Sequence, residues 1–196
     1  TLSCKAMRTK RFLTLLIFLH VSLFGFSQLI APTVWGTTPT NNAKPTWNWS
    51  SGGGDGVGVF QFGYDEIMWF PEEAVTSFTP SGNLSEGEHT LFVQERDASS
   101  NWSASGSFTI TIDLTPPATP TVNALTTNST SPTVTGTATV GAGEALTVTV
   151  NSVTYTVGDG NLSLSGTDWT LVIPGGDALG DGTYEVEATV TDAATN

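Results

Sequence analysis

The chain has 196 residues, a formal net charge of −12 and only 12% charged residues, with 21 Gly, 10 Pro and a single Cys. One Cys excludes a disulfide framework and a cysteine-based zinc site, and ten Phe and six Trp within 38% hydrophobic residues exclude a disordered chain. After residue 27 the chain contains all 18 Asp and Glu residues but only two basic residues, Lys44 and Arg96, so its formal charge there is −16. Such an acidic surface repels phosphate groups, so the composition indicates no nucleic-acid binding and no attraction to anionic lipid.

Residues 1–27 are interpreted as a few upstream residues followed by a secretory signal peptide that starts at Met7. A basic stretch at 8–11 precedes a mostly apolar run at 12–26, and small residues occupy positions −3 and −1 of a cut before Gln28. The run is shorter than the roughly 20 apolar residues that a spanning helix needs. We therefore expect a secreted or cell-surface protein with no membrane span in the mature chain, and an uncleaved anchor is the alternative.

Short segments rich in β-forming residues follow, separated by clusters of Gly, Pro, Asn and Ser. In the first half of the chain, strands are predicted at 46–50, 57–64, 76–79, 89–97 and 105–113. In the second half, they are predicted at 133–140, 145–150, 153–157, 169–173 and 183–192. Apolar and polar residues alternate with period two along these segments, and none shows a helical period. Short strands at this spacing predict an all-β sandwich architecture.

An internal repeat divides the chain into two similar units. Residues 84–101 and 179–196 align without a gap at an offset of 95, which predicts two tandem sandwiches at 28–114 and 120–196. The Pro-rich tract at 115–119 is expected to form a short, stiff linker between them.

The second unit is expected to be incomplete. It stops at Asn196, which aligns with Asn101, and the first unit continues past Asn101 into its last strand. We therefore expect the second sandwich to be truncated before its last strand, which leaves a neighbouring strand with an open edge.

The segments LSEGEHTLFVQERDASSN with DLTPPATP, and WTLVIPGGDALGDGTYEVEATVTDAATN, resemble tandem bacterial immunoglobulin-like repeats of secreted or surface adhesins and biofilm-associated proteins. The resemblance covers about residues 32–196. It implies non-catalytic stalk or adhesion-spacer modules, further repeats of the same chain as partners, an unnamed cell-surface or matrix ligand, and calcium at domain junctions in some relatives. Tyr184 matches the tyrosine corner of such domains, whose hydroxyl bonds to the backbone. His89 stands in its place in the first repeat, so the sequence does not establish that hydrogen bond there.

Calcium is the small ligand that the acidic residues favour, because hard oxygen donors suit it. The candidates are Asp97, Asp113 and Asp192, with Glu144 as an outside choice. Asp97 and Asp113 close the last two strands of the first repeat, so we expect them to share one end of the sandwich. No D-x-D-x-D loop is present, and ordinary turn formation by these Asp residues is the alternative.

Aromatic residues suggest a second ligand class, because exposed indoles stack on sugars. Five of the six Trp residues crowd the first repeat, namely Trp35, Trp47, Trp49, Trp69 and Trp102. Trp47 and Trp49 lie two positions apart and point to the same face, so both are candidates for glycan stacking. The alternative, which we favour, is that they fill the core between the sheets.

Catalysis has little support in the sequence. His89 is the only His after residue 27 and has no Ser or Cys nucleophile motif beside it. The paired acidic residues at 72–73 and 86–88 are typical of solvated loops. We expect a non-catalytic stalk or adhesion spacer, and a carbohydrate-binding accessory module of a larger secreted enzyme is the alternative function.

Overall fold

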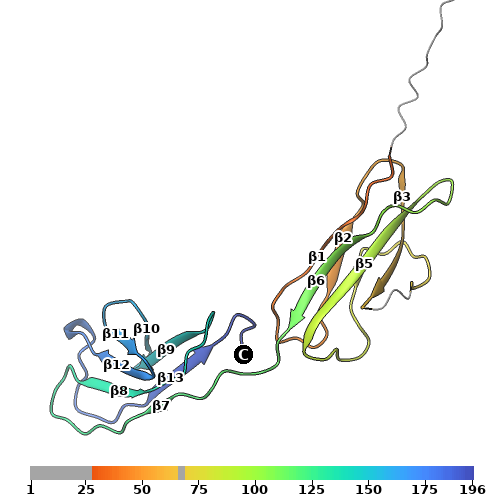
Figure 1. Cartoon of the computed structure of the whole chain (residues 1–196). Coiled ribbons are helices and arrows are strands. Elements are labelled where there is room, and N and C mark those ends of the chain that lie inside the picture. The colour runs from red at the N-terminus through yellow and green to blue at the C-terminus, as the bar shows by residue number, and fades with distance from the viewer. Residues whose placement is uncertain (1–27, 66–68) are drawn as a thin grey trace, which may run out of the picture.

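The computed structural model describes residues 28–65 and 69–196, and the predicted signal peptide lies outside this part of the chain. Figure 1 shows two all-β bodies joined by an extended linker, with the first strand of each body following an irregular segment. The only helical element among the described residues is a 3-10 turn, η1, at Gly175–Asp177. The prediction of an all-β chain is therefore confirmed.

The first body is a sandwich of two antiparallel sheets. One sheet has the order β1-β2-β4, with β1 at Thr33–Trp35, β2 at Trp47–Ser50 and β4 at Ser77–Phe78. The other has the order β3-β5-β6, with β3 at Gly56–Tyr64, β5 at Gly87–Asp97 and β6 at Gly106–Ile112. Strand β5 therefore has a neighbour on each side.

The second body repeats this plan without a counterpart of β6. Its larger sheet has the order β11-β12-β8-β7, with β7 at Thr121–Val122, β8 at Thr133–Thr137, β11 at Leu162–Ser165 and β12 at Asp168–Val172. Its other sheet has the order β10-β9-β13, with β9 at Ala145–Val150, β10 at Val153–Thr156 and β13 at Val186–Thr191. Among the described residues, β13 pairs with β9 alone, so its outer edge is open.

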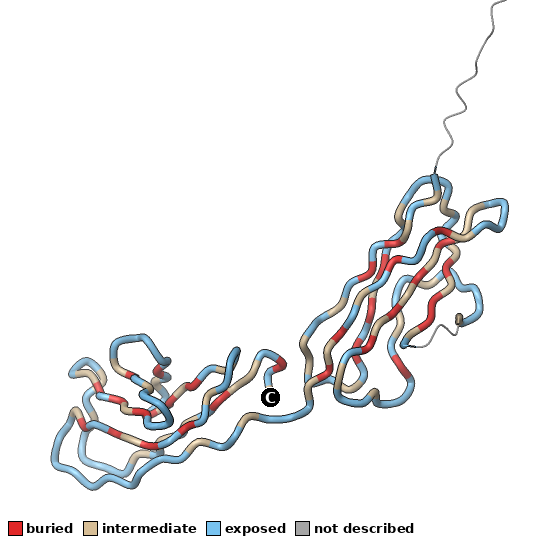
Figure 2. Tube along the Cα trace, viewed as in Figure 1, coloured by how far each residue is buried: buried red, intermediate tan, exposed pale blue. Residues whose placement is uncertain are grey.

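Each sandwich has its own hydrophobic core. In the first, Trp47 and Trp49 lie at the centre of the buried cluster, and in the second Trp169 does. Figure 2 shows buried residues recurring along the strands of both bodies. This burial follows from the period-two alternation, because every second side chain of a strand points between the sheets.

Strands β1 and β7 were not predicted from the sequence, and two further differences from the predicted elements have simple causes. Strand β11 was not predicted, because its residues alternate Leu with Ser inside a turn-rich stretch. The last strand begins at Val186 rather than at 183, because the preceding residues form the loop that holds Tyr184 against the core.

Candidate functional site at the joint between the sandwiches

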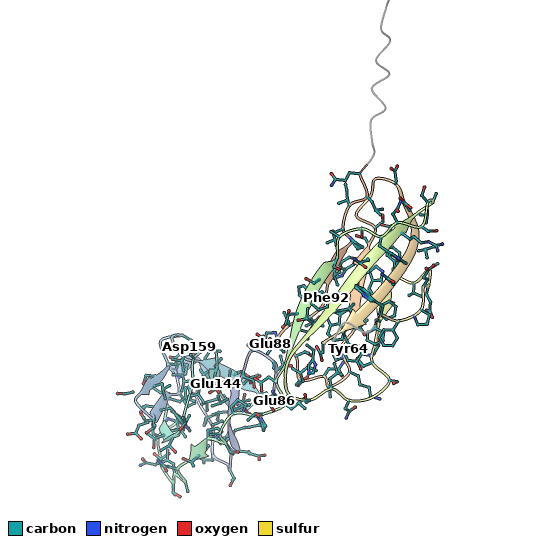
Figure 3. All side chains as sticks on the ribbon, turned by 45° about the vertical axis from the view of Figure 1, so that its right-hand side comes forward. Tyr64, Glu86, Glu88, Phe92, Glu144 and Asp159 are labelled. Atoms are coloured by element: carbon teal, nitrogen blue, oxygen red, sulfur yellow. The ribbon has the colours of Figure 1, made fainter. Side chains whose placement is uncertain are left out.

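The linker is held by hydrogen bonds from both sandwiches. Thr115 Oγ1 donates to the two carboxylate oxygens of Glu86 at 3.0 and 2.9 Å, and Thr115 N donates to Asp113 Oδ1 at 3.1 Å. From the second sandwich, Asn196 Nδ2 donates to Asp113 O at 2.7 Å. Figure 3 places Glu86 and Glu144 beside this joint. The joint is therefore a polar contact with defined partners on both sides.

A second contact joins the same two bodies. Asn41 Nδ2, in the first sandwich, donates to Thr195 O, in the second, at 3.1 Å. Figure 1 shows the turn after β13 close to the lower end of the first sandwich, as these bonds require. Two hydrogen bonds from different segments restrict rotation about the linker more than either would alone.

The D-A-x-x-N motif that the repeats share forms the same turn twice. Asp97 Oδ1 accepts from Asn101 N at 2.8 Å and Asp97 Oδ2 from Asn101 Nδ2 at 2.9 Å. Asp192 and Asn196 repeat these bonds at 2.9 and 3.1 Å. Hydrogen bonds from the Asn101 side chain and backbone lower the pKa of Asp97, and the Asn196 backbone and side chain lower the pKa of Asp192. The repeated motif is thus a turn stabilised by an ionised carboxylate.

Not all of the predicted calcium ligands meet in space. Asp113, Glu144 and Asp192 line one hollow beside the linker. Asp97 lies at the opposite end of the first sandwich, because β5 and β6 run antiparallel and Ile112, just before Asp113, pairs with Gly87. The prediction that Asp97 and Asp113 share an end of the sandwich is therefore wrong.

The carboxylates at the hollow already have hydrogen-bond donors. Glu144 Oε2 accepts from Gly141 N at 2.7 Å, and the Asp113 and Asp192 carboxylates accept from the backbone of their own turns. Within residues 28–65 and 69–196, no group of three or more His, Cys, Asp or Glu is close enough together to hold a metal ion. Turn formation accounts for these contacts, and calcium binding stays a hypothesis.

The structure places both candidate glycan-stacking residues in the core. Trp47 is 0% exposed and Trp49 is 2% exposed, so neither indole face reaches the surface to stack on a sugar. Trp47 Nε1 donates to Phe108 O at 3.0 Å, which satisfies its polar atom inside the sandwich. These two residues act in packing, and the glycan hypothesis does not extend to them.

Trp35 is the exception among the tryptophans. It is 45% exposed and lines a shallow hollow with Asn42, Asn48, Thr37 and Thr46. Trp69 and Trp102 are half-buried. An exposed indole beside amide and hydroxyl groups has the composition of a sugar subsite.

His89 makes a hydrogen bond to the backbone in the place where the second repeat has the tyrosine corner. Its Nε2 contacts Ser85 O at 2.8 Å, and its Nδ1 contacts Asp65 Oδ2 at 2.5 Å. Burial alone would lower the pKa of His89, but the hydrogen bond to Asp65, the Ser85 carbonyl and the Asp65 charge together raise it. Both ring nitrogens face acceptors, so the contacts favour the doubly protonated ring.

Sequence reasoning missed Glu95, which is 0% exposed in β5. Its carboxylate accepts from Ser51 Oγ at 2.6 Å and from Gly58 N at 2.9 Å, and so fixes the glycine-rich loop between them. A Cβ atom at Gly56 would lie 2.4 Å from this carboxyl group, so the loop needs glycine there. The sequence signal for Glu95 was its position two residues after Val93, which places its side chain on the inward face of β5.

Known proteins share this architecture. Residues 37–114 match the family model described as a bacterial Ig-like domain. Among solved structures, the fibronectin(III)-like modules of Clostridium thermocellum CbhA match with a TM-score of 0.55 and 11% identity, over 83% of this chain and 87% of that chain. Residues 37–114 are therefore similar to a bacterial Ig-like domain, and the chain as a whole has the fold of tandem immunoglobulin-like sandwiches.

Other solved structures match with lower TM-scores. The chicken CNTN1 FN1-FN3 domains match with a TM-score of 0.48 and 13% identity, over 86% of this chain and 64% of that chain. The central fibronectin-III array of RIM-binding protein matches with a TM-score of 0.35 and 15% identity, over 84% of this chain and 59% of that array. No curated protein sequence matches the chain. Within the described residues, no helix is long and apolar enough to cross a bilayer.

Proposed function

We propose that the two sandwiches form a stalk or adhesion spacer on the outside of a bacterial cell. The observation that carries this proposal is the path of the chain through the first sandwich. The chain enters at one end and leaves into the linker at the other, so this module adds its length to the span (Figure 1). Domain type supports the location, because Ig-like and fibronectin-like repeats are common in extracellular proteins.

The first sandwich is suited to resist pulling. Thr40 N donates to Thr111 O at 3.0 Å, Asp113 N donates to Thr40 O at 3.0 Å, and Thr40 bridges Ile112 in a parallel sense. Thr111 N also donates to Thr38 Oγ1 at 2.8 Å. A force between the entry and exit of the module pulls these two segments in opposite directions. The bonds are then loaded together in shear and must break together.

Single-molecule force spectroscopy tests this function. Handles are attached through cysteines placed at Gln28 and Thr119, in a chain carrying Cys4→Ser. We expect one high-force unfolding event, and we expect Thr38→Val to lower its force because Thr111 N loses its acceptor. Thr79→Val is the matched control, because it removes only the exposed bond between Thr79 Oγ1 and Thr46 Oγ1. Equal forces in the two variants would contradict the spacer mechanism.

Export is part of the same proposal and has a direct test. The chain is expressed with residues 1–27 in an exporting bacterial host, and the N-terminus of the extracellular product is sequenced. A product that begins at Gln28 supports the signal peptide. Retention of the full chain in the cytoplasm would contradict it.

Carbohydrate binding is the second candidate, and the exposed Trp35 favours it. Its hollow offers one indole face and the polar side chains of Asn42 and Asn48. Affinity electrophoresis in gels containing soluble polysaccharides would detect binding through retarded migration. We expect Trp35→Ala to abolish any retardation and Trp35→Phe to keep it, with Trp102→Ala as the control. Equal retardation of wild type and Trp35→Ala would remove this candidate.

A further inference from the structure

Asp-Gly dipeptides occur at three places in the described part of the chain, at 55–56, 159–160 and 181–182. This dipeptide can react with itself in water, because the backbone nitrogen of the Gly can attack Cγ of the Asp and close a five-membered succinimide ring. Gly favours the attack, since it has no Cβ to shield its nitrogen. The structure gives the three pairs different surroundings, which determine how readily each one reacts.

The pair at 159–160 is locked by hydrogen bonds. Asp159 Oδ1 accepts from Asn161 N and Leu162 N at 2.7 and 2.9 Å, and Asp159 Oδ2 accepts from Thr156 N at 2.9 Å. These backbone bonds, the one from Leu162 first, lower the pKa of Asp159, so little of its carboxyl is in the protonated form that can release water. All three bonds must break before Cγ of Asp159 can turn toward the nitrogen of Gly160.

The pair at 55–56 is restricted on its Gly side. Gly56 is the first residue of β3, where it pairs with Asp97 of β5. A Cβ at Gly56 would lie 2.4 Å from the buried carboxyl of Glu95, so this part of the backbone is closely packed. The attack requires the backbone to rotate between Asp55 and Gly56, and rotation there would disturb both the strand and the packing.

The pair at 181–182 has neither restriction. Asp181 and Gly182 are exposed and lie in a bend outside any strand. The hydrogen bonds that hold this loop lie on either side of the pair, from Leu179 N to Thr130 O at 2.7 Å and from the Tyr184 hydroxyl to Gly180 O at 3.3 Å. An exposed loop segment of this kind samples many backbone angles, which include those that bring nitrogen and Cγ together.

The first repeat has a less reactive pair at the same place. At the offset of 95, Asp181 and Gly182 align with Glu86 and Gly87. The additional methylene of Glu would require a six-membered ring, which closes far more slowly than a five-membered one. Glu86 also accepts the two bonds from Thr115 Oγ1, and Gly87 begins β5. The two repeats therefore differ in the chemical stability of one equivalent turn.

We propose that Asp181–Gly182 is a self-modification site, where aspartate converts to isoaspartate with water as the only co-reactant. Gly182 N bonds to Cγ of Asp181, and water leaves with the hydroxyl of the protonated carboxyl and the amide hydrogen. A second water then adds to the main-chain carbonyl carbon of Asp181 and breaks the bond from that carbon to Gly182 N. The product has an unchanged mass, and its backbone runs through Cβ and Cγ of residue 181. The proposal goes beyond the spacer function and holds whether or not the modules bear load.

The modification has a structural consequence for the tyrosine corner. It adds one methylene to the backbone between Gly180, whose carbonyl accepts the hydrogen bond, and Tyr184, whose hydroxyl donates it. The Tyr184 ring lies over this backbone, because a Cβ at Gly182 would be 3.7 Å from it. We therefore expect the longer loop to lose the bond from Tyr184 to Gly180, so that the second sandwich loosens with age at a place where the first does not.

Peptide mapping of the full chain tests the chemistry. The chain is incubated at neutral pH for several weeks, and samples are digested with endoproteinase Asp-N, which cuts before aspartate and not before isoaspartate. Mass spectrometry then gives the uncut fraction at each position. We expect cleavage before Asp181 to decline with time, whereas cleavage before Asp55 and Asp159 persists in the same samples and serves as the internal control.

Variants test the structural consequence. Asp181→Glu copies the first repeat, keeps the charge and prevents five-membered ring closure. Gly180→Ala is the matched control, because its added Cβ would lie 3.8 Å from the Tyr184 hydroxyl and it leaves the Asp-Gly pair intact. Amide hydrogen exchange over residues 179–186 is measured before and after incubation. We expect exchange to become faster in the wild type and in Gly180→Ala, and to stay constant in Asp181→Glu.

Three results would overturn the proposal. The first is undiminished cleavage before Asp181 after incubation. The second is an equal decline of cleavage before Asp55, Asp159 and Asp181, which would mean that the surroundings do not select the pair. The third is an equal rise of exchange in wild type and Asp181→Glu, which would place the change of the aged chain elsewhere.

Discussion

His89 and Tyr184 hold the same turn by different chemistry. Each lies at the same place in its repeat and contacts the backbone carbonyl four residues earlier, His89 through Nε2 to Ser85 O at 2.8 Å and Tyr184 through its hydroxyl to Gly180 O at 3.3 Å. The histidine tie depends on a titrating ring. The first sandwich is therefore expected to respond to pH.

The first sandwich is expected to lose stability as the pH rises above neutrality. The pKa of His89 is raised in the folded state, so its contribution is complete below the ordinary value of 6.5 and is lost as the pH rises through the folded value. Thermal unfolding at pH 6 and pH 8.5, followed by fluorescence, measures this loss. His89→Tyr is expected to remove the dependence between these pH values. A wild-type melting temperature that is equal at both pH values would contradict the assignment.

Acid is expected to act on the repeated turns in the opposite direction. The pKa values of Asp97 and Asp192 are lowered in the folded state, so their contribution is present above the ordinary carboxyl value and is lost as the pH falls through the folded values. Amide exchange in the turns at 97–101 and 192–196 should accelerate below pH 4 relative to the intrinsic rate. Unchanged relative exchange down to pH 2 would contradict this.

The joint is expected to loosen in Asn196→Ala. This change removes the bond to Asp113 O and the side-chain bond to Asp192. Asn101→Ala is the matched control, because it breaks the same side-chain bond of the first turn and has no contact at the joint. Labels on cysteines at positions 28 and 165, in a Cys4→Ser chain, report the distance between the bodies. We expect a broader distance distribution only for Asn196→Ala, and identical distributions would contradict the role of Asn196.

The two core tryptophans are expected to differ in their sensitivity to Phe. Trp47→Phe removes the indole bond to Phe108 O. Trp49→Phe removes a buried indole N–H that has no hydrogen-bond partner among the described residues. Both lose similar volume, so Trp47→Phe should lower the free energy of unfolding by about 1 kcal/mol more. Denaturant unfolding of both variants measures the difference, and a larger loss for Trp49→Phe would contradict the assignment.

Calcium has a simple thermal test. The carboxylates at the hollow are engaged by their own turns, so we expect millimolar calcium to shift the melting temperature no more than sodium chloride of equal ionic strength. A saturable, calcium-specific rise, removed by chelator and by Asp192→Asn, would instead establish the site.

The sequence predicts the sandwich architecture because alternation and repetition are local signals. Trp47 and Trp49 follow the same logic, since inward positions of a strand next to turn residues are core positions. Strand direction decides where strand ends lie, and this is why the prediction that grouped Asp97 with Asp113 failed. The end of one antiparallel strand lies beside the start of its neighbour, not beside its end.

Other features depend on partners that are distant in sequence. Glu95 looks like a misplaced charge until Ser51 and the amide of Gly58 are brought to it by the loop before β3. His89 likewise takes its role from Asp65, which is 24 positions away. Neither pair has a spacing that a sequence pattern would single out.

The joint also bears on how such chains change over generations. Each repeat carries the D-A-x-x-N turn at one end, and the first shows the carbonyl acceptor, Asp113 O, at the other. Contacts that run head to tail in this way allow a further identical unit to be added through the same hydrogen-bond donors and acceptors. Duplication or loss of whole units by recombination would therefore change the length of the array while keeping the hydrogen bonds of each joint.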